Sequence, residues 1–97
     1  MIPPTLKRFY KDPDATKDYS LDWRSFLEDG NVIFSSTWTV PGGITKVTDS
    51  HSSNITQVVL SGGTAGQTYQ VTNRIQWVTA SGTLQEERSI LIDVQQQ

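Results

Sequence analysis

The stretch TYQVTNRIQWVTASGTLQEERSILIDV, residues 68–94, decides the fold class. Apolar and polar residues alternate along its first half, and the apolar face is formed by Tyr69, Val71, Ile75 and Trp77. Such period-two alternation predicts a half-buried β-strand. Residues 80–82 read as a turn, and the returning segment has an apolar face formed by Ile90, Ile92 and Val94. The stretch therefore predicts an antiparallel hairpin over 69–79 and 83–94.

Shorter strand patterns precede this hairpin at 19–23, 32–40, 44–49 and 55–62. Within 32–40, one face would be formed by Val32, Phe34, Trp38 and Val40. Ile33 would then lie on the opposite face, which points to a bulge. Short strands separated by glycine and polar turns, without a helical period, predict a β-sandwich or a barrel.

Tyr69 favours the sandwich over the barrel. It follows a glycine turn at Gly66 and stands at the start of a long strand. Immunoglobulin-like folds place a tyrosine there, and its hydroxyl bonds to upstream backbone. We therefore expect an all-β, immunoglobulin-like antiparallel sandwich of about seven strands over residues 18–97. Its structural aromatic residues would be Tyr19, Trp23, Trp38, Tyr69 and Trp77.

Residues 1–17 are predicted to form an extended N-terminal arm, because Pro3, Pro4 and Pro13 interrupt any regular pattern. The arm is basic and aromatic near its middle. It is either an unstructured terminus or a docking arm that orders against a neighbouring subunit. If the surplus aromatic side chains lie outside the core, they form an exposed interaction surface. The residues expected to take part in it are Lys7, Arg8, Phe9, Tyr10 and Phe26.

Composition excludes several classes of protein and site. The chain has 97 residues, no cysteine and a formal net charge of −2. Disulfides and thiolate metal sites are therefore impossible. No basic face indicates nucleic-acid binding. The start lacks an apolar signal region, and no apolar run approaches the ~20 residues that span a bilayer. We expect neither nucleic acid nor membrane as a partner.

Two groups of residues invite a chemical interpretation. Asp12, Asp14, Asp18 and Asp22 are either a calcium-binding loop or ordinary turn and solvent-facing positions. Their spacing does not follow a calcium-loop pattern, which favours the second interpretation. His51 is the only histidine and no nucleophile motif accompanies it, so a hydrolase using His51 is the weaker alternative. We expect no enzyme activity, no catalytic residue, no metal and no cofactor.

Four segments carry a family resemblance. They are KDPDA followed by DY and DW at 11–23, SSTWTVPGGIT at 35–45, LSGGTAGQTYQVTNRI at 60–75 and ERSILIDV at 87–94. Together they resemble small virion-associated proteins of tailed bacteriophages and prophages. The resemblance covers nearly all of the chain after residue 10. It implies an immunoglobulin-like sandwich on or near the particle and brings no catalytic or metal residue.

The function expected from this resemblance is that of a non-enzymatic structural component of a tailed-phage particle. It would serve as a head decoration, a head–tail connector or a tail-associated protein. The expected partners are capsid, connector or tail proteins, with self-association open. The chain would be made in the bacterial host cytoplasm and would end in the virion. The alternative is a carbohydrate- or host-surface-binding β-sandwich module.

Overall fold

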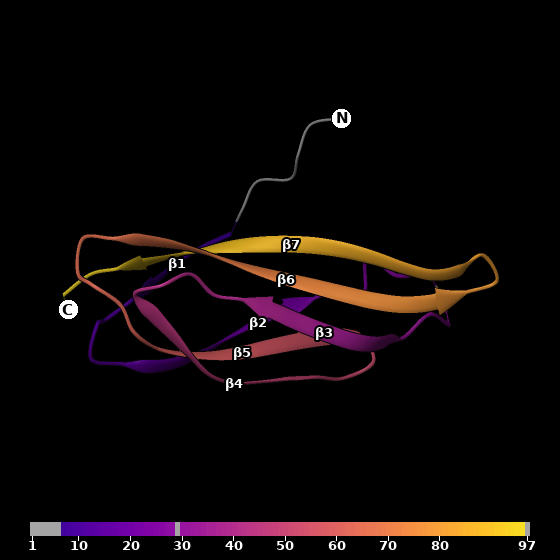
Figure 1. The fold of residues 1–97 in the computed structure, drawn as a ribbon, viewed down its shortest axis with the longest axis horizontal. Coiled ribbons are helices and arrows are strands. Elements are labelled where there is room, and N and C mark those ends of the chain that lie inside the picture. Colours follow the sequence, from indigo (N-terminus) through magenta and orange to yellow (C-terminus); the bar gives the residue numbers. More distant parts are fainter. Residues whose placement is uncertain (1–6, 29, 97) are drawn as a thin grey trace, which may run out of the picture.

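The computed structural model describes residues 7–28 and 30–96, and these residues form two packed β-sheets without a helix (Figure 1). The strands are β1 (Lys7–Lys11), β2 (Thr16–Asp22), β3 (Ile33–Thr39), β4 (Ile44–His51), β5 (Ile55–Gly62), β6 (Thr68–Thr79) and β7 (Gly82–Val94). One sheet has the order β1-β7-β6-β3 and the other β2-β5-β4. The predicted all-β sandwich is confirmed. In the described part of the chain, no helix is long and apolar enough to cross a membrane.

The predicted hairpin forms as β6 and β7. Tyr69 pairs with Ile92, Trp77 pairs with Leu84, and the ladder continues to Gly82 at the turn. The predicted apolar faces of both strands are buried, because each inward side chain is at most 9% exposed from residue 69 to 77 and from residue 90 to 94. This hairpin is the longest element of the fold and forms the centre of the four-stranded sheet.

The core lies between the two sheets and is rich in aromatic side chains. All five aromatic residues expected to be structural are buried there: Tyr19, Trp23, Trp38, Tyr69 and Trp77. Trp23 is fully buried, and its Nε1–H donates to Thr56 Oγ1 at 3.1 Å and to Asn73 Oδ1 at 3.2 Å. The buried polar groups of this network thus satisfy one another, which removes most of their desolvation cost.

The Tyr69 hydroxyl makes the contact that its position predicts. It accepts a hydrogen bond from the backbone N–H of Thr64 at 3.0 Å, upstream of its own strand. Gly63 lies close by with φ +97, and a Cβ there would stand 2.7 Å from Val94 Cγ2. The turn between β5 and β6 is therefore packed against the end of β7, and only a glycine fits at that point.

The strand order is that of immunoglobulin-like sandwiches for all strands after β1. Those folds place strands B, E and D in one sheet and C, F and G in the other. Here β2-β5-β4 faces β7-β6-β3, which is the same order when β2 to β7 are taken as B to G. The difference is β1, which runs parallel to β7, whereas the other strand pairs are antiparallel.

Part of the segment expected as an extended arm, residues 1–17, lies within strands of the sandwich. Lys7–Lys11 form the edge strand β1, and β2 already starts at Thr16. The sandwich therefore includes most of the expected arm. Only a turn at Pro13 and Asp14 separates the two strands, and proline suits such a turn. The rest of the expected arm, residues 1–6, lies outside the described residues.

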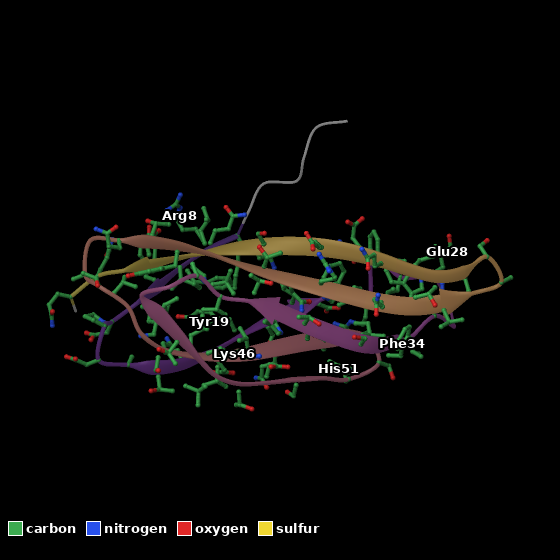
Figure 2. All side chains as sticks on the ribbon, viewed as in Figure 1. Arg8, Tyr19, Glu28, Phe34, Lys46 and His51 are labelled. Carbon is green, nitrogen blue, oxygen red and sulfur yellow. The ribbon has the colours of Figure 1, made fainter. Side chains whose placement is uncertain are left out.

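The predicted facing of β3 is wrong, although the bulge itself is confirmed. The register of β3 on β6 shifts between Ile33 and Ser35. Ile33 is buried with Trp38, whereas Phe34 and Val32 are each 52% exposed. The extra residue at the bulge reverses the alternation of side chains along the strand. Strict period two therefore assigns the residues that precede the bulge to the wrong face. Phe34 consequently points to solvent (Figure 2).

Candidate interaction surface

The edge strand β1 carries four of the five expected interaction residues. Phe9 packs inward on Tyr19, with ring centroids 5.2 Å apart. Arg8 and Tyr10 alternate with it and lie on the outer side of the sheet, as Figure 2 shows for Arg8. Tyr10 is 57% exposed, whereas Phe9 is only partly exposed and packs against the core. Lys7 and Tyr10 are therefore exposed on opposite faces of the strand, while Phe9 packs against the core.

Arg8 is engaged in the outer face of its own sheet. Its Nη1 lies 2.7 Å from both carboxylate oxygens of Asp93 on β7. Thr68 on β6 donates its hydroxyl to the same carboxylate. The hydrogen bonds from Arg8 and then from Thr68 hold the pKa of the Asp93 carboxyl below its ordinary value. Three strands are thus joined by one buried carboxylate, and the Arg8 charge is already compensated.

Lys11 closes the C-terminal end of β1. It is 1% exposed, and its Nζ donates to the carbonyl oxygens of Asp12 at 2.9 Å and Gly62 at 2.6 Å. Burial lowers the pKa of this ammonium, because the charged form loses its water. Lys11 therefore fastens β1 to the end of β5 and is unavailable to a partner.

Phe26, the fifth expected interaction residue, lies in the loop between β2 and β3. Its ring meets Trp23 and Trp77 edge-on, at centroid distances of 5.6 and 5.5 Å. The guanidinium of Arg88 lies 4.5 Å from the Trp23 ring and 5.4 Å from Phe26. Such cation–π contacts hold the loop against β7.

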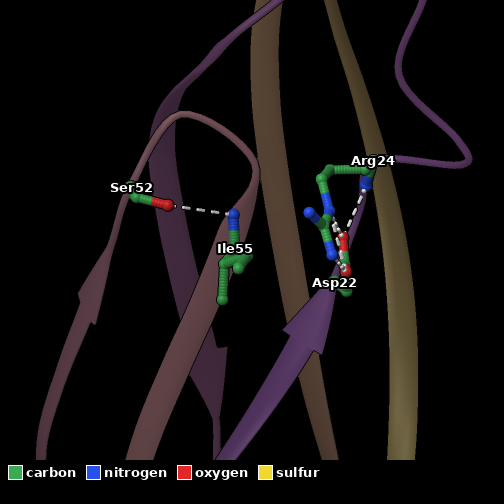
Figure 3. Close-up of polar contacts among 4 residues, drawn as sticks. All are labelled: Asp22, Arg24, Ser52 and Ile55. Carbon is green, nitrogen blue, oxygen red and sulfur yellow. Dashed lines mark hydrogen bonds and ion pairs between the residues drawn. The ribbon is translucent and has the colours of Figure 1, made fainter.

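Polar contacts fix the two ends of this loop. Asp22 accepts the backbone N–H of Arg24 at 2.9 Å and its guanidinium at 2.6–3.0 Å (Figure 3). The guanidinium, followed by the backbone N–H, lowers the pKa of Asp22 to about 2. Trp23 and Ile33 donate their N–H groups to the neighbouring turn at residues 52–54, which is closed by a bond from Ile55 to Ser52 Oγ. The loop that carries Phe26 is therefore tied to the β4–β5 turn.

An open hollow lies where this loop meets the β6–β7 hairpin. Its volume is about 600 Å³, and its lining includes Phe26, Leu27, Glu28, Trp77 and Leu84. Phe26 is 36% and Leu84 40% exposed, so apolar side chains in this mixed polar and apolar lining are reachable by solvent. Glu28 lies at the end of the molecule where the hairpin turns (Figure 2). We name this feature the hairpin hollow.

The expected interaction residues therefore do not form a single patch. Lys7 and Tyr10 lie on β1, beside the C-terminal end of β7. Phe26 lies in the hairpin hollow, beside the first half of β7. Leu84, which pairs with the buried Trp77, was missed as a surface residue. Its signal is strand length: β6 and β7 have 12 and 13 residues, whereas the strands of the other sheet have 7 or 8 and do not cover Leu84.

The other candidate chemistry is dispersed. Asp12 accepts the backbone N–H of Asp14 at 2.8 Å, which is turn geometry. Asp18 and Asp22 are exposed on the outer side of β2. His51 ends β4 beside a polar hollow of about 300 Å³, whose lining also includes Ser20, Ser50 and Gln57. Across residues 7–28 and 30–96, no group of three or more His, Cys, Asp or Glu side chains could hold a metal ion.

Comparison with known proteins identifies a family. The sequence model of the family described as podophage GP4 fiber-tail adaptor protein gp77 matches residues 11–93, which includes β2 to β6 and nearly all of β7. No curated protein matches the chain. Because the match covers most of the chain, the chain belongs to this family of phage tail proteins.

Proposed function

We propose that this member of the fiber-tail adaptor family joins a tail fiber to the tail of a podophage particle, as a non-enzymatic structural protein. The observation that carries the proposal is the family match over residues 11–93. It favours the tail over the head decoration and head–tail connector roles that the sequence also allowed. The chain is then made in the host cytoplasm and assembled into the virion, and the sandwich is an immunoglobulin-like module.

The geometry supports an adaptor because an adaptor needs two separate contact surfaces. The molecule measures 47 × 30 × 19 Å along its principal axes. The hairpin turn lies at one end of the long axis, and the C-terminus with the β1–β2 turn lies at the other (Figure 1). Two partners can therefore bind without overlap. We assign one contact to the outer face of β1 around Tyr10 and the other to the hairpin hollow.

Repetition would strengthen such contacts. Phage tails are symmetric assemblies, and each weak contact of an adaptor recurs at every symmetry-related position. Linked contacts bind as one unit with an effective concentration set by geometry, so that avidity replaces single-site affinity. A small sandwich with modest exposed apolar surface can serve in this way without a large interface.

The test is particle composition after loss of the chain. A phage with a stop codon early in this gene is grown in a host that does not supply the protein, and particles are purified. An adaptor predicts particles that keep the tail proteins but lose the fiber protein, and a plasmid copy of the gene restores it. Full fiber content without the chain contradicts the proposal and directs attention to carbohydrate or host-surface binding.

A further inference from the structure

β1 is an addition to a sandwich that is complete without it. The family model matches residues 11–93, so only the last residue of β1 belongs to the matched region. Without β1, each of the two sheets keeps three strands, in the order of immunoglobulin-like sandwiches. β1 also runs parallel to β7, whereas the other strand pairs are antiparallel. β1 can therefore leave its place while both sheets persist.

The place that β1 occupies is specific for this strand. The backbone of β1 pairs with Ile90–Val94, and the N–H of Gln95 donates to the carbonyl oxygen of Lys11 at 2.9 Å. Three side chains of β1 also meet groups of matching chemistry, namely Arg8 with the Asp93 carboxylate, Phe9 with the Tyr19 ring and Lys11 with the Gly62 carbonyl. We name these receiving groups the β1 site. It fits a basic strand with one inward aromatic side chain, and three of the five residues of β1 are basic.

A short turn, residues 12–15, joins β1 to β2. It is closed by a hydrogen bond from the N–H of Ala15 to the Asp12 carbonyl at 3.1 Å, and by one from the N–H of Asp14 to the Asp12 carboxylate at 2.8 Å. The second bond is exposed, and water replaces such a bond at small cost. The contacts of β1 are the same whether the β1 site belongs to its own chain or to another copy. Opening of this turn is therefore the main difference between the two arrangements.

The β1 site and the turn at residues 12–15 lie on the same edge of the sandwich. β1 and β2 are edge strands of the two sheets, and Phe9 of β1 packs on Tyr19 of β2. Once opened, the linker of four residues spans at most roughly 17 Å. A neighbour that receives β1 within this reach must present the same edge, so its own β1 lies within reach of the first copy. Reciprocal exchange of this kind gives a closed two-fold dimer.

We propose that two copies of the chain exchange β1 across this edge, so that β1 of each copy occupies the β1 site of the other. The contacts of Arg8, Phe9 and Lys11 then form between copies. Tyr10 stays on the outer face of the sheet, so the surface assigned to an adaptor contact is retained in the dimer. The inference goes beyond the adaptor function and does not rest on it. No step depends on residues 1–6, which precede β1 in the chain.

Isotope-filtered NMR tests the exchange directly on the full chain. Isotope-labelled and unlabelled chains are unfolded together in urea and refolded, then studied at about 1 mM, the range of effective concentration that a short linker provides. We expect a dimer in sedimentation, and a nuclear Overhauser effect between the Phe9 ring of one chain and the Tyr19 ring of the other. A monomer would overturn the inference, and so would a dimer in which this effect arises only within single chains.

Two charge-reversed variants test the β1 site itself. Arg8→Asp and Asp93→Arg each place like charges together when a chain docks its own β1. In a mixture of the two variants, exchange brings opposite charges together at both β1 sites. We therefore expect the mixed dimer to form at least about tenfold more tightly than either variant associates with itself. A chain that carries both changes regains opposite charges and shows whether the substitutions permit folding.

The matched control is the ion pair of Arg74 and Glu87, which joins β6 to β7 and is not exchanged. A mixture of Arg74→Asp and Glu87→Arg should show no preference for mixed dimers. The same preference in both mixtures, or none in the mixture of Arg8→Asp and Asp93→Arg, would overturn the inference. The adaptor role is read from particle composition, so its failure is distinct from failure of the exchange.

Discussion

At the scale of single residues, Trp23 combines packing with polar recognition. Its indole is fully buried between the sheets, and its N–H reaches Thr56 and Asn73. It also carries the ring contacts that hold Phe26 and Arg88. The same side chain therefore supports both the core and the loop that forms the hairpin hollow.

Replacing Trp23 by alanine should cost about 3–5 kcal/mol of unfolding free energy, the usual cost of deleting a large buried aromatic side chain. The control is Val78→Ala, because Val78 is 60% exposed and its change should stay within about 0.5 kcal/mol. Urea unfolding followed by fluorescence or circular dichroism measures both variants. A loss below about 1 kcal/mol for Trp23→Ala would refute the assigned role.

Substitutions at Gly63 and Gly66 distinguish the cost of steric overlap from the cost of backbone strain. Both have positive φ, +97 and +90 respectively. A Cβ at Gly66 meets nothing within 4 Å, whereas one at Gly63 meets Val94 Cγ2 at 2.7 Å. Gly66→Ala should cost about 1–2 kcal/mol for the backbone alone. Gly63→Ala should cost a further 1–3 kcal/mol, roughly, because Val94 is buried and cannot move aside. Equal losses in urea unfolding would show that the turn is not tightly packed.

At the scale of elements, the attachment of β1 depends on an ionised carboxylate. The pKa of Asp93 is lower in the folded protein than its ordinary value, chiefly because Arg8 bonds to the charged form. As pH falls below about 4, the unfolded chain binds the proton more readily than the folded one. The stabilisation by Asp93 is thus present above this pH and is lost as pH falls through the folded pKa.

We therefore expect β1 to detach before the rest of the fold on acidification. The protection of the β1 amides against hydrogen exchange should fall below about pH 4, while the amides of β5 and β6 stay protected. Asp93→Asn should produce the same faster exchange at neutral pH, because Arg8 then loses its charged partner. Glu87→Gln is the control, since it removes an exposed ion pair of small energetic value. Uniform loss of protection across all strands would argue against a separately attached β1.

The elements also show what alternation can predict. The β6–β7 hairpin and the inward residues of β2 and β5 follow from period two, because each strand buries one face. The facing of β3 does not, since one bulge residue inverts it. Alternation does not predict β1 either. Its partner β7 lies at the other end of the chain, and the prolines on both sides of this short edge strand disfavour a strand prediction. Strand alternation predicts which side chains face the opposite sheet. It does not predict where that sheet ends and leaves such side chains exposed.

At the scale of the whole molecule, the sandwich is elongated and has two different ends. The unequal length of the two sheets creates the hairpin hollow, and the parallel β1 fixes the other surface. The sequence predicts neither feature, because both depend on how far one sheet extends over the other. Family membership places the chain among phage tail proteins, and two separate ends are what the proposed adaptor role requires.

The most direct test of the adaptor role is the copy number and location of the chain in purified phage. Quantitative mass spectrometry is applied to whole particles and to tails separated from heads. The account predicts a small number of copies that matches the fibers and stays with the tail fraction. Hundreds of copies per particle, close to the number of the major capsid protein and retained with the heads, would contradict it.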